Sequence, residues 1–289
     1  MRIFYALNFV IYFSVFIFAS KLHNQALLTT KHIKIMAQFK VHNLIIVDAS
    51  GSMTSIYEQA LAGINETLST IREEAKKSDK IEQSVTVLSF ASGGEPLQYA
   101  YRNTIAEQTS PLTPNDYTLR GMTALYDAIG TSVTDLERNK GKEDKVLVTI
   151  ITDGYENDSI EWDGASVKKL IDRLRKTGWV FTYIGANQDA ALEAGKIGVK
   201  NSLTFEATIE GTVNMFAFEK QSRKYWNERV RRNEMRAILR SRISPTTTND
   251  NGKGWIPIGI QPFLIQSSIP DYLTILTVLM PPSATTLTK

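Results

Sequence analysis

Asn43-Leu-Ile-Ile-Val-Asp-Ala-Ser-Gly-Ser-Met-Thr54 is the stretch around which we expect this chain to fold. Its four apolar residues, Leu44 to Val47, have the length and the β-branching of a strand that is buried on both faces of a parallel sheet. Asp48, Ser50 and Ser52 then follow at alternate positions. Three oxygen-bearing side chains therefore gather at the carboxyl end of a strand, where open α/β sheets place their ligand sites. One carboxylate and two hydroxyls suit Mg²⁺ or Mn²⁺ better than zinc, which prefers nitrogen and sulfur.

Two later stretches repeat this pattern of a polar residue at a strand-to-helix junction. Residues 121–127, Gly-Met-Thr-Ala-Leu-Tyr-Asp, place Thr123 where a new helix opens, and residues 146–154 end a second buried strand on Asp153. Each has an ordinary structural explanation, because Thr is a common helix N-cap and Asp before Gly is a common turn former. Their shared order and position favour one common site over three unrelated caps.

At these residues the sequence resembles the von Willebrand factor A domains. Their metal-ion-dependent adhesion site consists of Asp-x-Ser-x-Ser, a distant Thr and a distant Asp. The resemblance extends over about residues 40–232, and the stretches 152–157 and 183–189 are similar to a bacterial or phage-associated branch of the family. It implies five metal-site residues, none of which departs from the family pattern: Asp48, Ser50, Ser52, Thr123 and Asp153.

The resemblance also implies a fold and an activity. The fold is a Rossmann-like α/β arrangement of three layers, with a mostly parallel six-stranded sheet, one antiparallel edge strand and helices on both faces. The activity is metal-dependent protein binding without catalysis, in which Mg²⁺ or Mn²⁺ keeps one coordination position for an Asp or Glu of an unidentified protein partner. We expect Asp48 and Asp153 to act through water while the hydroxyls coordinate the cation directly. No small-molecule substrate is expected.

Two other functions remain as alternatives. A buried strand that ends in Asp also opens the phosphotransferases of the haloacid dehalogenase type, where Asp48 would be the nucleophile. Those enzymes need a second Asp two residues later as acid and base, and this chain has Ser50 there, which cannot serve as a general acid near neutral pH. The other alternative is a scaffold domain that binds no metal.

The rest of the chain alternates between strand and helix patterns, which predicts a parallel sheet covered on both faces. The segment 103–120 is polar and contains two prolines, so we expect a loop there. Hydrophobic periodicity predicts helices that begin near residues 56, 125, 167, 189 and 211, the last extending beyond 230. It predicts strands at residues 44–47, 85–90, 97–102, 144–152, 179–185 and 201–205.

Composition excludes several kinds of site. The 289 residues are 43% apolar, enough for a core, and contain no cysteine, which rules out disulfides, thiolate nucleophiles and cysteine metal sites. The three histidines all lie before or at the first strand, and neither a Gly-x-Ser-x-Gly elbow nor a Gly-rich phosphate loop is present. The net charge of +3 does not by itself point to a partner.

The two ends of the chain are assigned separately from the domain, which we expect over residues 38–235. Residues 1–35 contain an apolar run from Ile3 to Ala19 that has the form of a signal peptide or membrane anchor, but translation from Met36 would make them a mis-annotated upstream segment. Localisation follows that choice: cytoplasmic from Met36, and membrane-anchored or exported if residues 1–20 are genuine. Membrane contact is expected only in that second case. No function is predicted for the tail, residues 243–289.

The last predicted helix is basic, with nine Lys or Arg and three Glu between Glu219 and Arg242. We interpret it as a solvated helix face, with a nucleic-acid or anionic-membrane surface as the alternative. Tyr225 and Trp226 are too few aromatic residues to indicate base stacking, so nucleic-acid binding is not expected.

Overall fold

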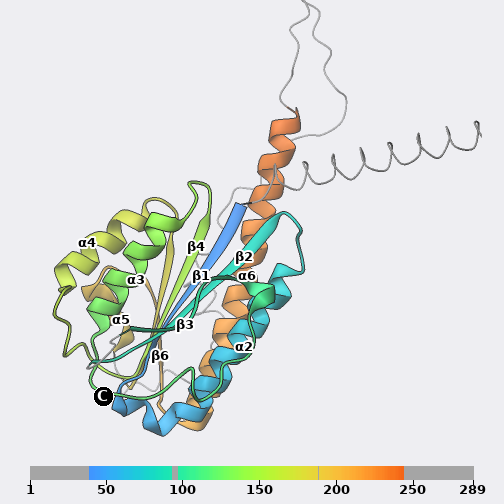
Figure 1. Ribbon diagram of the computed structural model, residues 1–289. Coiled ribbons are helices and arrows are strands. Elements are labelled where there is room, and N and C mark those ends of the chain that lie inside the picture. The colour runs from blue at the N-terminus through green and yellow to red at the C-terminus, as the bar shows by residue number, and fades with distance from the viewer. Residues whose placement is uncertain (1–38, 93–96, 188, 244–289) are drawn as a thin grey trace, which may run out of the picture.

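The computed structural model describes residues 39–92, 97–187 and 189–243 (Figure 1). At its centre lies a six-stranded sheet in the order β3-β2-β1-β4-β5-β6, with β3 antiparallel to β2 and the other pairs parallel. The predicted mostly parallel sheet with an antiparallel edge strand is confirmed. The strands are β1 (Phe39–Asp48), β2 (Ile81–Phe90), β3 (Leu97–Ile105), β4 (Lys145–Thr152), β5 (Val180–Ala186) and β6 (Asn201–Phe205).

Helices cover both faces of the sheet, which confirms the predicted three layers (Figure 1). On one face lie α2 (Tyr57–Ala75) and α6 (Ile209–Ile243), and on the other lie α3 (Leu125–Asn139), α4 (Gly164–Arg175) and α5 (Ala190–Lys196). Alternation along β1 explains the two cores, because Ile45 points toward α2 and α6 whereas Leu44 and Ile46 point toward the other three helices. Two short 3-10 helices complete the described elements: η1 (Gly51–Ile56) and η2 (Ala106–Gln108).

Three strands are longer than the hydrophobic pattern predicted. β1 begins at Phe39 instead of Leu44, β2 begins at Ile81 instead of Val85, and β3 continues to Ile105. The added part of β1 contains His42 and Asn43, which are buried between β2 and β4. Such buried polar residues interrupt the apolar run of a strand. A search for apolar runs therefore misses this part of β1, although its polar groups are hydrogen-bonded to distant partners.

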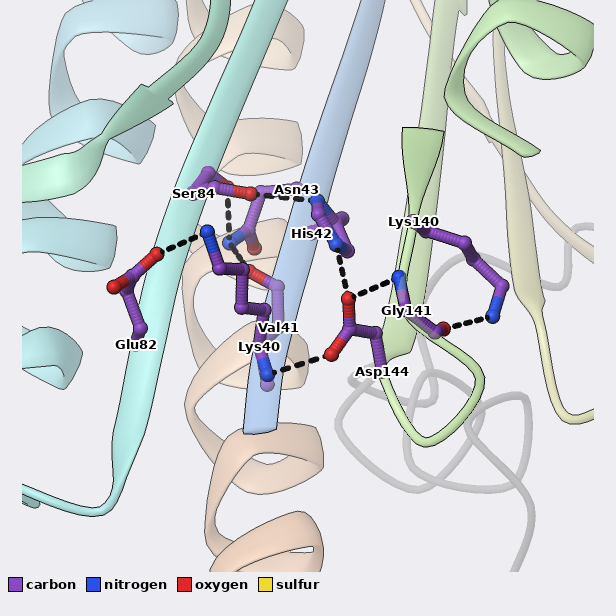
Figure 2. A network of polar contacts seen from close by, with 9 residues as sticks. All are labelled: Lys40, Val41, His42, Asn43, Glu82, Ser84, Lys140, Gly141 and Asp144. Carbon is purple, nitrogen blue, oxygen red and sulfur yellow. Dashed lines mark hydrogen bonds and ion pairs between the residues drawn. The ribbon is translucent and has the colours of Figure 1, made fainter. Parts of the chain in front are cut away.

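His42 and Asp144 join the start of β1 to the turn before β4 (Figure 2). His42 Nε2 lies 2.9 Å from Asp144 Oδ2, and His42 Nδ1 lies 2.7 Å from Ser84 Oγ on β2. The Asp144 carboxylate also accepts hydrogen bonds from the backbone N–H groups of Lys40 (3.0 Å) and Gly141 (2.7 Å). Burial alone would raise the pKa of Asp144, but these donors outweigh it and hold that pKa below its usual range.

Helix α6 faces the sheet partly with polar groups, and one of the basic residues that we assigned to a solvated face, Arg223, is among them. Arg223 and Glu219 form an ion pair in which both side chains are almost fully buried. The Arg223 guanidinium also donates to Asn43 Oδ1 on β1 (2.7 Å) and to Thr149 Oγ1 on β4 (3.0 Å). Asn227, one turn later, accepts a 2.8 Å hydrogen bond from the Gln83 amide on β2. Part of the basic composition of this helix is therefore interior structure.

Helix α6 also runs past the edge of the sheet where the parallel strands begin (Figure 1). Glu234 reaches Lys145 at the start of β4 (3.8 Å), so residues 235–243 continue for about 13 Å beyond that level. Within the described residues, no helix has a stretch that is apolar and long enough to cross a bilayer. The apolar run from Ile3 to Ala19 and the tail after Ile243 lie outside the described residues.

Candidate metal centre

Asp48 occupies the centre of the candidate site, at the last position of β1. It is 0% exposed, and its backbone carbonyl accepts a 2.6 Å hydrogen bond from the Tyr117 hydroxyl. One carboxylate oxygen accepts from the Ser50 backbone N–H (2.8 Å) and the other from the Thr152 hydroxyl (2.5 Å). These contacts fix the carboxylate at the carboxyl edge of the two central strands, which is where the sequence predicted it.

Ser50 and Ser52 continue the line of oxygens from β1 toward β4. Ser50 Oγ is buried and lies 3.0 Å from Ser52 Oγ, which in turn donates a 2.6 Å hydrogen bond to Asp153 Oδ1. Asp153 directly follows β4, the strand that pairs with β1. Two residues that are 101 positions apart are thus joined, because neighbouring parallel strands end at the same edge.

Thr123 reaches the site from the loop before α3. Its buried backbone is held by Asn157, whose side chain accepts from Thr123 N–H (2.8 Å) and whose N–H donates to Thr123 C=O (3.1 Å). Gly154 lies beside both the Thr123 hydroxyl and the Asp48 carboxylate and shows that the two are close together. A Cβ added to Gly154 would lie 2.9 Å from Thr123 Oγ1 and 3.6 Å from Asp48 Oδ2. All five residues predicted for the metal site are therefore gathered at one point.

Two carboxylates outside the predicted set shape the loop that carries Asp153. Asp127, in the first turn of α3, accepts hydrogen bonds from the backbone N–H groups of residues 160, 161 and 162. Glu156 accepts from the N–H groups of Tyr126, Asp158 and Ser159. No spacing rule in the sequence assigns Asp127 to its three backbone donors, or Glu156 to the Tyr126 N–H, because each of these donors is 30 or more residues away.

The electrostatics of the site favour a cation. Burial raises the pKa of Asp48, with hydrogen bonds from Thr152 and Ser50 opposing the rise and the charge of Asp153 adding to it. Burial also raises the pKa of Asp153, opposed by the hydrogen bond from Ser52. Both shifts mean that negative charge is unfavourable here without compensation. A divalent cation between the two carboxylates would supply that compensation.

The donor set decides which cations fit. Two carboxylates and three hydroxyls are hard oxygen donors, which suit Mg²⁺ or Mn²⁺. The Ser50 and Ser52 hydroxyls are hydrogen-bonded to one another, and the Ser52 hydroxyl also donates to Asp153. A bound cation would replace these hydrogen bonds with direct coordination by the same oxygens. In the described part of the chain, no three His, Cys, Asp or Glu residues form a group that could hold a metal, so at this site the hydroxyls would have to complete the donor set beside the two carboxylates.

Comparison with known proteins gives one family match. A model of the von Willebrand factor type A domain matches residues 44–220. A search of curated proteins found no match.

Solved structures with similar folds include one protein from mussel and two from bacteria. Proximal thread matrix protein 1 from the mussel byssus, solved with a zinc-occupied MIDAS motif, is 16% identical with a TM-score of 0.42, covering 63% of this chain and 44% of that one. The pilus adhesin SpaC from Lactobacillus rhamnosus GG is 12% identical with a TM-score of 0.47, covering 64% and 30%. The PilB minor pilin from Streptococcus sanguinis is 13% identical with a TM-score of 0.45, covering 64% and 61%. This chain thus spans less than half of the mussel protein.

Proposed function

Because this chain belongs to the von Willebrand factor type A domain family, we propose that it is an interaction module that binds a divalent cation and, through it, a protein partner. Asp48, Ser50, Ser52, Thr123 and Asp153 would hold the cation. The observation that carries the proposal is the fully buried Asp48 carboxylate, with its raised pKa, in hydrogen-bonded contact with the loop that leads through two serines to a second carboxylate.

The partner's contribution follows from charge and coordination number. Two carboxylates nearly balance a divalent cation, yet Mg²⁺ takes about six ligands in an octahedron. Ser52 and Asp153 lie at the outer side of the site, partly or fully open to solvent. An Asp or Glu of a partner protein could approach from there and complete the coordination with a charge-assisted contact. The cation would supply Lewis-acid attraction for that carboxylate, and no chemical step is required.

Thermal unfolding with and without metal tests the proposal. The protein is melted in EDTA and then in rising Mg²⁺ or Mn²⁺. A cation that binds only the folded state adds about 2.7 kcal/mol at 100 times its dissociation constant, so the melting temperature should rise by several degrees. The variant Thr123→Ala/Asp153→Ala should lose this rise. The matched control, Thr177→Ala/Asp79→Ala, removes one exposed Thr and one exposed Asp at the opposite edge of the sheet and should keep it.

If metal does not raise the melting temperature of the wild type, the cation proposal is wrong and the scaffold alternative takes its place. If metal stabilises the protein, a pull-down in Mg²⁺ against EDTA is the route to the partner. Loss of a captured protein in EDTA, and with Asp153→Ala, is then the expected result.

Enzymatic alternatives gain no support from the geometry. The hydroxyl of Ser50, where a phosphotransferase needs its acid and base, is buried against Ser52. Ser84, His42 and Asp144 lie in the order hydroxyl, imidazole, carboxylate of a serine hydrolase, but Ser84 is 2% exposed and offers its hydroxyl to no substrate. A phosphatase assay of the wild type and Asp48→Asn checks the first alternative. Turnover that this substitution abolishes would overturn the assignment as a binding module.

A further inference from the structure

The edge of the sheet where the parallel strands end and the edge where they begin carry opposite charge in their loops. At the edge of the candidate metal site, the loops that follow β4, β5 and β6 contain seven Asp or Glu and no Lys or Arg. At the other edge, the loops that lead into β2, β4, β5 and β6 contain seven lysines and three acidic residues. Six of these lysines are exposed, and we call them the basic edge: Lys76, Lys77, Lys80, Lys142, Lys176 and Lys200.

The charge of the basic edge is little compensated within the fold. Lys77 forms an ion pair with Glu74, but the other five lysines have no ion pair to any residue in the described parts of the chain. Of the three acidic residues in these loops, Asp144 is already occupied by His42 and two backbone N–H groups. Helix α6 adds the exposed Arg232, which pairs with Glu228 of the same helix at 3.7 Å, and the exposed Arg236 near the same edge. A net positive surface therefore faces solvent there.

We propose that the basic edge binds the anionic surface of a phospholipid membrane. Lysine ammonium groups are compact point charges, and here they are spread over four separate loops, which suits a diffuse field of lipid phosphates better than one defined phosphate. A single-stranded nucleic acid would call for exposed aromatic side chains on which bases stack. Among the described residues, the aromatic side chain with the largest exposure is Tyr155. It lies two residues after Asp153, at the opposite edge, and so offers no stacking surface at the basic edge.

The chain enters the domain at this same edge, which is therefore the edge connected to the N-terminal apolar run. β1 begins there, so residues 20–38, which span at most about 65 Å when fully extended, connect it to the apolar run from Ile3 to Ala19. If that run enters a bilayer, this linker lets the basic edge lie against the lipid. The metal site lies at the far end of the ten-residue β1, about 33 Å further from the lipid. The site would then face away from the membrane and toward solution.

Vesicle binding by the full-length protein tests this proposal. The protein is floated with phosphatidylcholine vesicles and with vesicles in which about a third of the lipid is phosphatidylserine, at low and high NaCl. Each lysine near an anionic leaflet strengthens binding about fivefold, so Lys80→Gln/Lys142→Gln/Lys176→Gln should weaken the phosphatidylserine-dependent binding about 100-fold. The matched control, Lys169→Gln/Lys196→Gln/Lys220→Gln, makes the same change in net charge at lysines of α4, α5 and α6 that are not part of the basic edge, and it should bind as the wild type does.

Each other outcome overturns the proposal. Equal binding to both vesicle types would mean that an apolar segment, and not the basic edge, holds the protein to lipid. Equal weakening by the two triple variants would mean that only net charge matters. Tighter binding of a 30-nucleotide single strand than of the phosphatidylserine vesicles, at the same salt, would assign the surface to nucleic acid. Because none of these assays contains added metal, their outcome is independent of the proposed cation site.

Discussion

Replacing Arg223 by Met should destabilise the protein severely, because it leaves the Glu219 carboxylate buried without a cation. Both side chains are almost fully buried, and Arg223 also donates to Asn43 and Thr149. Removing one partner of a buried ion pair costs about 3–5 kcal/mol, and Met keeps most of the volume, so the loss reports charge more than cavity. We expect about 4 kcal/mol, a large part of the 5–15 kcal/mol that typically holds a domain folded.

Urea unfolding followed by circular dichroism measures this loss. With an m-value of about 2 kcal/mol per molar urea, the midpoint of Arg223→Met should fall by about 2 M at unchanged m. Arg232→Met, an exposed position on the same helix, should shift it by less than about 0.3 M. The double variant Glu219→Gln/Arg223→Met buries no charge and should recover at least half of the loss. A loss under about 1 kcal/mol for the single variant, or no recovery in the double variant, would refute the argument.

Three further predictions concern the other polar contacts. Asp144→Asn should destabilise the protein by about 1–3 kcal/mol at neutral pH. Because folding lowers the pKa of Asp144, the difference in unfolding free energy from the wild type should shrink as the pH falls through and below the usual pKa of Asp, which urea unfolding from pH 7 to 3 measures. Gly154→Ala, whose Cβ would lie 2.9 Å from Thr123 Oγ1, should weaken Mg²⁺ about tenfold in a titration followed by melting temperature; unchanged affinity would separate Thr123 from the metal. Tyr117→Phe leaves the buried Asp48 carbonyl without its 2.6 Å donor and should cost about 1–3 kcal/mol of unfolding free energy, and an unchanged midpoint would contradict this.

The sequence predicted those parts of the fold and site that depend on local pattern. Apolar strands that end in Asp48 and Asp153, and a Thr at a helix opening, are visible in short windows of sequence. Parallel strands end at one edge, so these windows also predict that the residues meet, and the structure brings them together. Whether they bind a metal stays a prediction.

The parts that the sequence did not predict depend on pairs of residues far apart in the chain. The polar His42 can be buried in a strand because its ring is hydrogen-bonded to Asp144, 102 residues later. Arg223 can likewise be buried because its guanidinium donates to Asn43, 180 residues earlier. Hydrophobic periodicity measures only whether a side chain is apolar. It therefore reads a satisfied buried polar residue as a solvent-facing one, so it began β1 too late and assigned Arg223 to a solvated helix face.

The arrangement in which β1 begins and α6 ends at the same edge has a mechanical consequence. A pull applied between these two ends of the domain would open β1 from that edge and load its hydrogen bonds to β2 and β4 one after another. A pull between either end and a partner held at the proposed metal site would instead act along the strands and load all of those hydrogen bonds together, because they link β1 sideways to β2 and β4 at even spacing along its length. The domain would yield easily when its own ends are drawn apart and resist when it tethers a partner.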